Sequence, residues 1–186
     1  MSSTVLKRSM STNDDIVKRT KTNKQNTSAR NFFDAVVTDI KIGNTTTIVE
    51  FKIKDSDISM ISSITNRSAE NLDLDIDDEI VAFFKAPSVI VAKVDQEYDI
   101  TYSADNVFRS KLTEISNSGL SCELKLTSIV DANIKFVATI TYKSSEIIYQ
   151  TELCRPLDEF DVLINSNNII LSKKSMKSKK SMKSDS

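Results

Sequence analysis

The chain has 186 residues, 39% of them hydrophobic, no His, no Trp and a net charge of −1. The lack of His removes the commonest general base and metal ligand at neutral pH, so we expect no enzyme activity. The two cysteines, Cys122 and Cys154, form no CxxC pair, so we expect no metal site. No apolar run is long enough for a signal peptide or a membrane span, which indicates a cytoplasmic protein without membrane contact.

Charge is distributed unevenly, because both ends are basic and the middle is acidic. Residues 1–27 carry a net charge of +4 and residues 172–186 a net charge of +5, which leaves −10 for residues 28–171. Both ends are polar, and the second contains the repeat SKKSMK-SKKSMK, so we predict a disordered basic arm and a disordered Lys/Ser tail. An acidic body repels anions at long range, so an anion site within it needs local cations and donors.

Short runs rich in β-branched residues predict two similar sets of strands in the middle of the chain. The first set covers Phe33–Ile42, Thr47–Ile53, Ile58–Ile64, Glu79–Phe84 and Ser88–Val94, and the second covers Phe108–Ile115, Ser121–Ile129, Asn133–Thr141, Glu159–Ile164 and Asn168–Leu171. A short helix is predicted over 66–72, with Thr65 as its N-cap. Five strands and a short helix are typical of a small OB-like barrel, so we predict an all-β fold of two tandem OB-like β-barrel modules, each with one short helix.

The two sets are copies of one unit, because short motifs recur at nearly constant spacing. The matching pairs are Ser28 and Ser103, Asn31 and Asn106, Thr65 and Thr141, and Ser68 and Ser144. The spacing grows after an insertion around residues 150–156, and we place module 1 at 28–97 and module 2 at 98–171. Units this small often need a partner to bury enough surface, so we expect tight packing between modules and a dimer.

Three motifs of module 1 have the chemistry to hold a small oxyanion. Thr65 and Ser68 place two hydroxyls at the start of the predicted helix, where backbone N–H groups are free. Ser28 and Arg30 point to the same side of an extended segment, and Arg offers a forked donor that stays charged. Lys85 follows an apolar strand and precedes Ala-Pro, which holds its charge near a turn.

Each motif also has a plainer interpretation when it is taken alone. Thr65 and Ser68 can be an ordinary helix cap, and Arg30 can be a solvated side chain at the end of an arm. Lys85 can be an edge-strand lysine that discourages aggregation. The order of the motifs therefore matters more than any one of them.

In that order, SARN, TxxSAExL and FKAPSVI resemble the molybdate-binding Mop family, also called molbindin or TOBE. The resemblance covers residues 27–94 well and 103–171 more loosely. The tandem arrangement resembles the C-terminal half of ModE-type molybdate-responsive regulators, in which a second module also begins SADN.

The resemblance implies an OB-like barrel that binds molybdate or tungstate as the intact oxyanion, at interfaces between modules. The implied ligand-binding residues are Ser28, Arg30, Thr65, Ser68 and Lys85, with the backbone N–H of Ala86 as an extra donor. Some of them are expected from a second subunit, in a homodimer or higher homo-oligomer with shared sites.

The chain departs from the family pattern at three places. Asp73 stands where the family usually has Gly after the helix, so we expect Asp73 to adopt a left-handed conformation. In module 2, Asp105 replaces the Arg and Asn165 replaces the Lys, so we predict that module 2 does not bind an anion by itself.

The leading functional hypothesis is a cytoplasmic molybdate/tungstate-binding protein for molybdenum homeostasis, storage or sensing. The alternative is the effector and dimerisation part of a ModE-like regulator that lacks its winged helix-turn-helix, acting with a full-length regulator. Residues 1–27 are too short for that DNA-binding domain, so we expect no specific DNA binding. An OB-type nucleic-acid binder is disfavoured, because the body is acidic and its Phe residues lie in apolar strand patterns.

Overall fold

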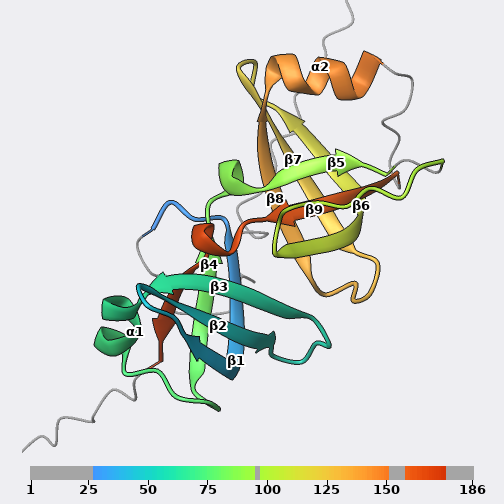
Figure 1. Cartoon of the computed structure of the whole chain (residues 1–186). Helices are drawn as coiled ribbons and strands as arrows, with labels where there is room; N and C mark the ends of the chain where they lie inside the picture. Colours follow the sequence, from blue (N-terminus) through green and yellow to red (C-terminus); the bar gives the residue numbers. More distant parts are fainter. Residues whose placement is uncertain (1–26, 95–96, 151–157, 175–186) are drawn as a thin grey trace, which may run out of the picture.

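The computed structural model describes residues 27–94, 97–150 and 158–174, and their ten strands form two five-stranded antiparallel sheets (Figure 1). The predicted basic arm lies outside the described residues except for residue 27, and so do residues 175–186 of the predicted tail. Most of the predicted insertion also lies outside them. No helix among the described residues is long and apolar enough to cross a membrane.

The first sheet has the strand order β10-β4-β1-β2-β3. Its strands are β1 (Asn31–Ile42), β2 (Thr46–Ile53), β3 (Ser59–Thr65), β4 (Glu79–Phe84) and β10 (Ile170–Lys173). The helix α1 (Asn66–Leu72) follows β3 at the predicted position, and a 3-10 turn, η2 (Ala86–Ser88), follows β4. The strand β10 runs two residues past the predicted end of module 2.

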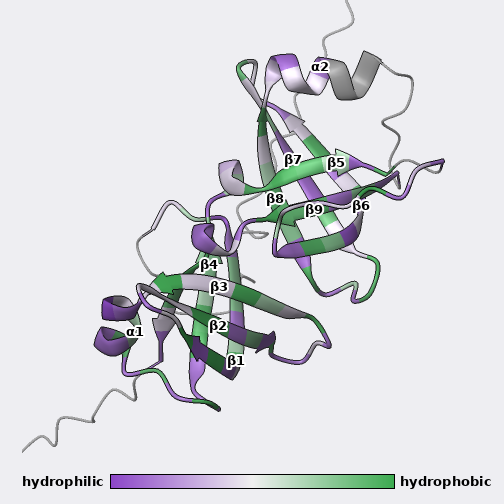
Figure 2. Cartoon of the chain, in the orientation of Figure 1, coloured by the Kyte–Doolittle hydropathy of each residue, from purple (hydrophilic) through white to green (hydrophobic). Residues whose placement is uncertain are grey.

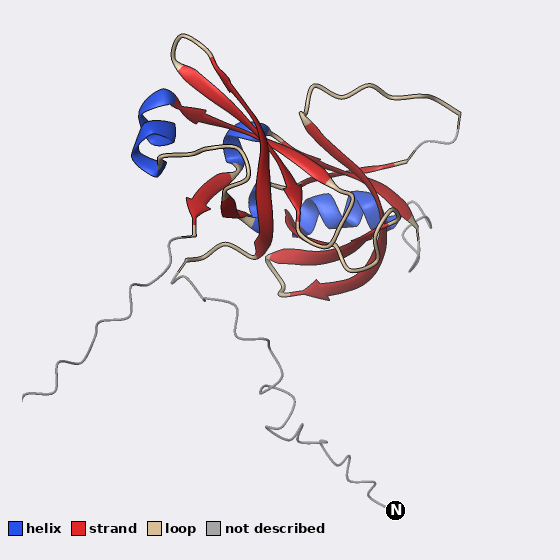
Figure 3. Ribbon diagram, turned by 90° about the horizontal axis from the view of Figure 1, so that it is seen from below, coloured by secondary structure: helices blue, strands red, loops and turns tan. Residues whose placement is uncertain are grey.

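The second sheet repeats this arrangement with the order β5-β9-β6-β7-β8. Its strands are β5 (Ile90–Lys93), β6 (Asn106–Asn117), β7 (Ser121–Ser128), β8 (Lys135–Thr141) and β9 (Glu159–Ile164). The helix α2 (Tyr142–Gln150) follows β8, and a 3-10 turn, η3 (Ser166–Asn168), follows β9. Both sheets are strongly curled, and the helices lie outside them (Figure 3).

The two halves of the sequence exchange their last strands. The strand β5 pairs with β9 in the second sheet, with Ile90 opposite Leu163, and β10 pairs with β4 in the first sheet, with Ile170 opposite Phe83. The sequence predicts strands at both places, but it does not indicate that each belongs to the other half's sheet. Since each sheet depends on a strand from the other half, the halves fold as coupled units.

Alternation along the strands builds the core. In β1, side chains from Asn31 to Val37 alternate between buried and more exposed positions, as period-2 patterning requires. The rings of Phe33 in the first sheet and Phe136 in the second lie 5.7 Å apart, and Phe136 stacks on Phe108 at 5.2 Å. The two cores are therefore joined by aromatic contacts, while α1 and the loops carry mostly polar residues (Figure 2).

Two buried asparagines tie each half to the other by matching hydrogen bonds. The side chain of Asn31 donates to the carbonyl of Val137 at 2.9 Å and accepts from its N–H at 2.8 Å. Asn106 makes the same pair of bonds to Ile61, at 2.9 Å and 2.7 Å. Each side chain thereby satisfies the backbone of one residue on the facing strand, which explains why the Asn of SARN recurs in SADN.

The predicted left-handed conformation of Asp73 is confirmed. Asp73 ends α1 with φ 49° and ψ 55°, and its backbone N–H reaches the carbonyls of Ala69 and Glu70. This is the helix-ending geometry that glycine adopts without steric cost.

Replacing Asp73 with Gly should raise the free energy of unfolding by about 0.5–1 kcal/mol, because the left-handed conformation then loses its Cβ penalty. Urea unfolding followed by circular dichroism measures this change. Asp75→Gly is the matched control, since Asp75 lies nearby and is not among the positive-φ residues, and it should leave stability unchanged or lower it. If the Asp73→Gly variant is no more stable than the natural chain, the left-handed conformation of Asp73 does not cost stability.

Candidate functional site

Arg30 and Lys85 stand side by side at one end of the first sheet. The last paired position of β1 and β4 is Asn31 opposite Phe84, and the next residues outward are Arg30 and Lys85. Opposed residues of an antiparallel pair have Cβ atoms about 5 Å apart. Both side chains are exposed, and the ammonium of Lys85 has no hydrogen-bond or ion-pair partner within the part of the chain that the structure describes. Two fixed positive charges therefore occupy facing positions one residue beyond the paired part of β1 and β4.

Ser28 and Ala86 flank this pair of cations. Ser28 is exposed and lies at a bend in the chain two residues before Arg30. Ala86 is buried and begins η2, a turn that packs against β8 of the second sheet. The cations thus lie where the first half meets the second.

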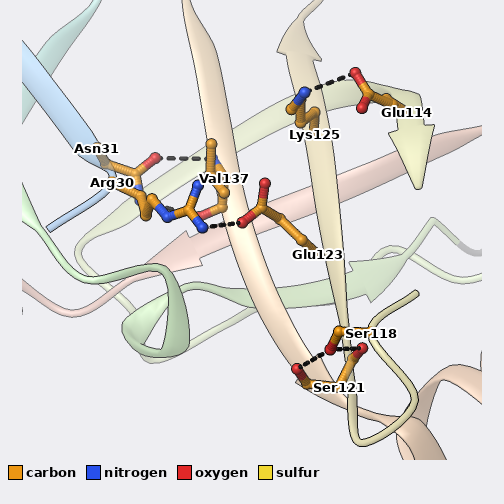
Figure 4. Close-up of polar contacts among 8 residues, drawn as sticks. All are labelled: Arg30, Asn31, Glu114, Ser118, Ser121, Glu123, Lys125 and Val137. Atoms are coloured by element: carbon orange, nitrogen blue, oxygen red, sulfur yellow. Dashed lines mark hydrogen bonds and ion pairs between the residues drawn. The ribbon is translucent and has the colours of Figure 1, made fainter. Parts of the chain in front are cut away.

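Arg30 makes an ion pair across this junction. One terminal nitrogen of its guanidinium lies 3.0 Å from a carboxylate oxygen of Glu123 on β7, beside the bonds from Asn31 to Val137 (Figure 4). The side chain of Arg30 is 62% exposed and that of Glu123 is 22% exposed. Glu123 is not predictable from the sequence, because it has the pattern of an ordinary strand residue and only the fold brings it to Arg30.

Thr65 and Ser68 form the helix cap that the sequence predicts. The Thr65 hydroxyl oxygen accepts from the Ser68 N–H at 3.1 Å and lies 2.8 Å from the Ser68 hydroxyl. The second half repeats this cap, with 3.1 Å and 3.0 Å between the matching atoms of Thr141 and Ser144. Two hydroxyls therefore lie together at the start of α1.

This hydroxyl pair and the cations lie at opposite ends of the first sheet. Ile42, the last residue of β1, pairs with Thr47, and the neighbouring Thr46 pairs with Thr65. Thr65 therefore lies at the Ile42 end of β1, whereas Arg30 precedes its other end, roughly 35 Å away along an extended strand of that length. The structure brings Arg30 and Lys85 together, but it does not bring Thr65 and Ser68 to them within one chain.

In the second half, the carboxylate of Asp105 takes the backbone N–H that corresponds to the N–H of Ala86 in the first half. Asp105 and Asn165 hold the places of Arg30 and Lys85, one residue beyond the pair of Asn106 and Ile164. A carboxylate oxygen of Asp105 accepts from the backbone N–H of Ser166 at 3.1 Å, and Ser166 begins η3 as Ala86 begins η2. Hydrogen bonds from Ser166 hold the pKa of Asp105 below its usual range.

Comparison with known proteins identifies a matching domain family and similar proteins. Residues 27–91 match the family model described as TOBE domain. Over 113 residues the chain is 29% identical to the Molybdenum transport protein ModE of Azotobacter vinelandii, and the match covers 61% of this chain and 40% of that protein. The chain thus spans less than half the length of this relative.

A solved structure matches most of the fold. It is described as the cytoplasmic molybdate-binding protein ModG with molybdate bound, and it covers 80% of this chain and 99% of its own, with a TM-score of 0.68 and 23% sequence identity. Residues 27–91 are therefore similar to the TOBE domain, and the predicted resemblance to tandem Mop/TOBE proteins and the OB-like fold are confirmed.

Because the Ser166 N–H donates to the carboxylate of Asp105, the NMR chemical shift of this amide should report the titration of Asp105 in the acid range. The folded-state pKa lies below that of the unfolded chain, so the bond contributes to stability above the ordinary Asp pKa of about 3.9 and is lost as the pH falls through the lower folded value. Amide NMR between about pH 2.5 and 6 should show Ser166 shifting with a midpoint below about 3.9. Asp105→Asn should abolish the shift, and a midpoint at or above the ordinary Asp value would contradict the bond.

Proposed function

We propose that this chain is a cytoplasmic protein that binds molybdate or tungstate as the intact oxyanion, for molybdenum homeostasis, storage or sensing. The observation that carries the proposal is the pair of cations, Arg30 and Lys85, at the end of the first sheet. These charges stand out from a body of net charge −10 over residues 28–171. The matched TOBE domain and the names of the two relatives, both of which refer to molybdate or molybdenum, support this choice of ligand.

The proposed site binds without covalent chemistry. Arg30 supplies a planar fork of donors and Lys85 a point charge, which together offset the two charges of the ligand. The hydroxyl of Ser28 and the backbone N–H of Ala86 add neutral donors from the same end of the sheet. Sulfate has the same charge and shape, so discrimination against it comes from the size of the site.

The remaining donors come from a second copy of the chain in this proposal. Thr65 and Ser68 lie at the far end of the first sheet from Arg30, so another subunit has to present them to the cations. The resulting homodimer has two shared sites related by symmetry.

An exposed apolar row beside the cations supports such a dimer. Phe32, Phe83 and Ile170 lie in register across β1, β4 and β10, and the rings of Phe32 and Phe83 stack at 5.6 Å. Phe32 is 42% exposed and Ile170 is 52% exposed. Covering this row removes apolar surface from water directly next to Arg30 and Lys85, which stabilises an interface at that place.

The second half is proposed not to bind an oxyanion. Asp105 brings a negative charge to the place of Arg30, and its carboxylate already takes the N–H of Ser166. This internal anion both repels a ligand and occupies a donor that the ligand would need.

A second candidate function is the effector and dimerisation part of a ModE-like transcriptional regulator. It is favoured by the match over 113 residues to a ModE protein, because the match covers 40% of that longer protein. Both candidates require the same oxyanion site. They differ in the partner, since the second requires association with a longer regulator chain.

Replacing Arg30 or Lys85 with Ala should weaken oxyanion binding at least about tenfold and leave the fold intact, because each change removes an exposed charge from the site. Isothermal titration with molybdate, tungstate and sulfate measures the affinities. Lys111→Ala is the matched control, since Lys111 is a half-exposed lysine on β6 of the second sheet, and its affinity should equal that of the natural chain. Unchanged binding in both Arg30→Ala and Lys85→Ala would remove the proposed site.

A further inference from the structure

Glu123 is an acidic side chain held against a cation of the proposed site. Its carboxylate lies 3.0 Å from the guanidinium of Arg30, although the two residues belong to different halves of the chain. We propose that Glu123 sets the affinity of the site by acting as an internal competitor of the oxyanion for Arg30. This inference rests on the proposed function and adds a residue to the site that the motifs of module 1 do not contain.

The surrounding contacts show that the pair is built into the junction. Asn31, the next residue after Arg30, is buried and bonded twice to Val137, so the base of the Arg30 side chain is fixed over the second sheet. Lys125, the nearest cation on the same face of β7 as Glu123, is engaged by Glu114 at 2.7 Å (Figure 4). Arg30 is therefore the cation that remains for Glu123 among the residues drawn there.

The charge balance of the site follows from this pair. Arg30 and Lys85 together carry two positive charges, and Glu123 offsets one of them. The site consequently presents one net positive charge to an incoming dianion. A partly solvated pair of this kind is weak enough to open, so it modulates the site without closing it.

Binding costs affinity whichever way Arg30 responds. If Arg30 keeps its contact with Glu123 and uses its other N–H groups for the ligand, the carboxylate and the dianion share one guanidinium and repel each other. If Arg30 turns away to the ligand, the ion pair with Glu123 is lost. Both arrangements predict that the oxyanion binds more tightly once Glu123 loses its charge.

The competitor acts on charge and not on size, so it does not discriminate between oxyanions of equal charge. Molybdate, tungstate and sulfate meet the same carboxylate at the same distance from Arg30. Removing that charge should therefore raise the affinity for each by a similar factor and leave their order unchanged. Glu123 sets the threshold concentration for binding, and the rest of the site sets the selectivity.

Titration calorimetry with molybdate and sulfate on the full chain and its Glu123→Gln variant tests this inference. The variant keeps the side-chain shape and should bind molybdate about tenfold more tightly at low salt, with a smaller gain at high salt because screening weakens the repulsion. Asp57→Asn is the matched control, since it removes a carboxylate that pairs with Lys52 at 2.8 Å and contacts neither Arg30 nor Glu123, and its affinity should not change. Thermal melting should show that both variants are folded.

The outcomes separate this inference from the proposed function. Equal or weaker molybdate binding by Glu123→Gln, in a chain whose binding still depends on Arg30, would overturn the competitor role and leave the site in place. A gain that persists undiminished at high salt would also overturn it, because the effect would not be electrostatic. Absence of binding in both the natural chain and Glu123→Gln would contradict the site and the competitor together.

Discussion

The exchange of the last strands between the two halves is the constraint on which the rest of this structure depends. It places β5 in the second sheet and β10 in the first, so neither sheet is complete without the other half. The bonds from Asn31 to Val137 and from Asn106 to Ile61 then fix the facing strands in register. Because each Asn directly follows a position of the proposed anion site or of its counterpart in the second half, the bonds that join the halves also fix the backbone beside those positions.

The two halves share one backbone arrangement but carry side chains of opposite charge at the matching position. In the first half the position before the Asn is Arg30, which stands opposite Lys85 and leaves positive charge exposed. In the second half the same position is Asp105, whose carboxylate satisfies the N–H of Ser166 within the chain. The first copy therefore presents the cations of the proposed anion site, whereas the second copy carries its own carboxylate at the matching position.

Much of the fold follows from the sequence, because period-2 patterning and the cap at Thr65 are local signals. The ten strands, the helix over 66–72 and the left-handed Asp73 were all predictable in this way. The strand exchange was not, since β5 carries the same pattern whichever sheet receives it. The ion pair of Arg30 with Glu123 was not predictable for the same reason, as it exists only after the exchange has brought β7 to the first half. The site residues themselves came from motif order, and their separation into two groups required the strand register.

In the proposed dimer, the cations of one chain and the hydroxyl pair of another form each site. This arrangement is tested most directly by mixing two defective variants, Arg30→Ala/Lys85→Ala and Thr65→Ala/Ser68→Ala, refolding them together and titrating with molybdate. With random pairing, about half of the dimers contain one chain of each variant, and each such dimer has one intact site and one defective site. About a quarter of all sites should therefore bind molybdate. If the mixture binds no more than its separate components, the cations and hydroxyls do not meet between chains, and the shared site is contradicted.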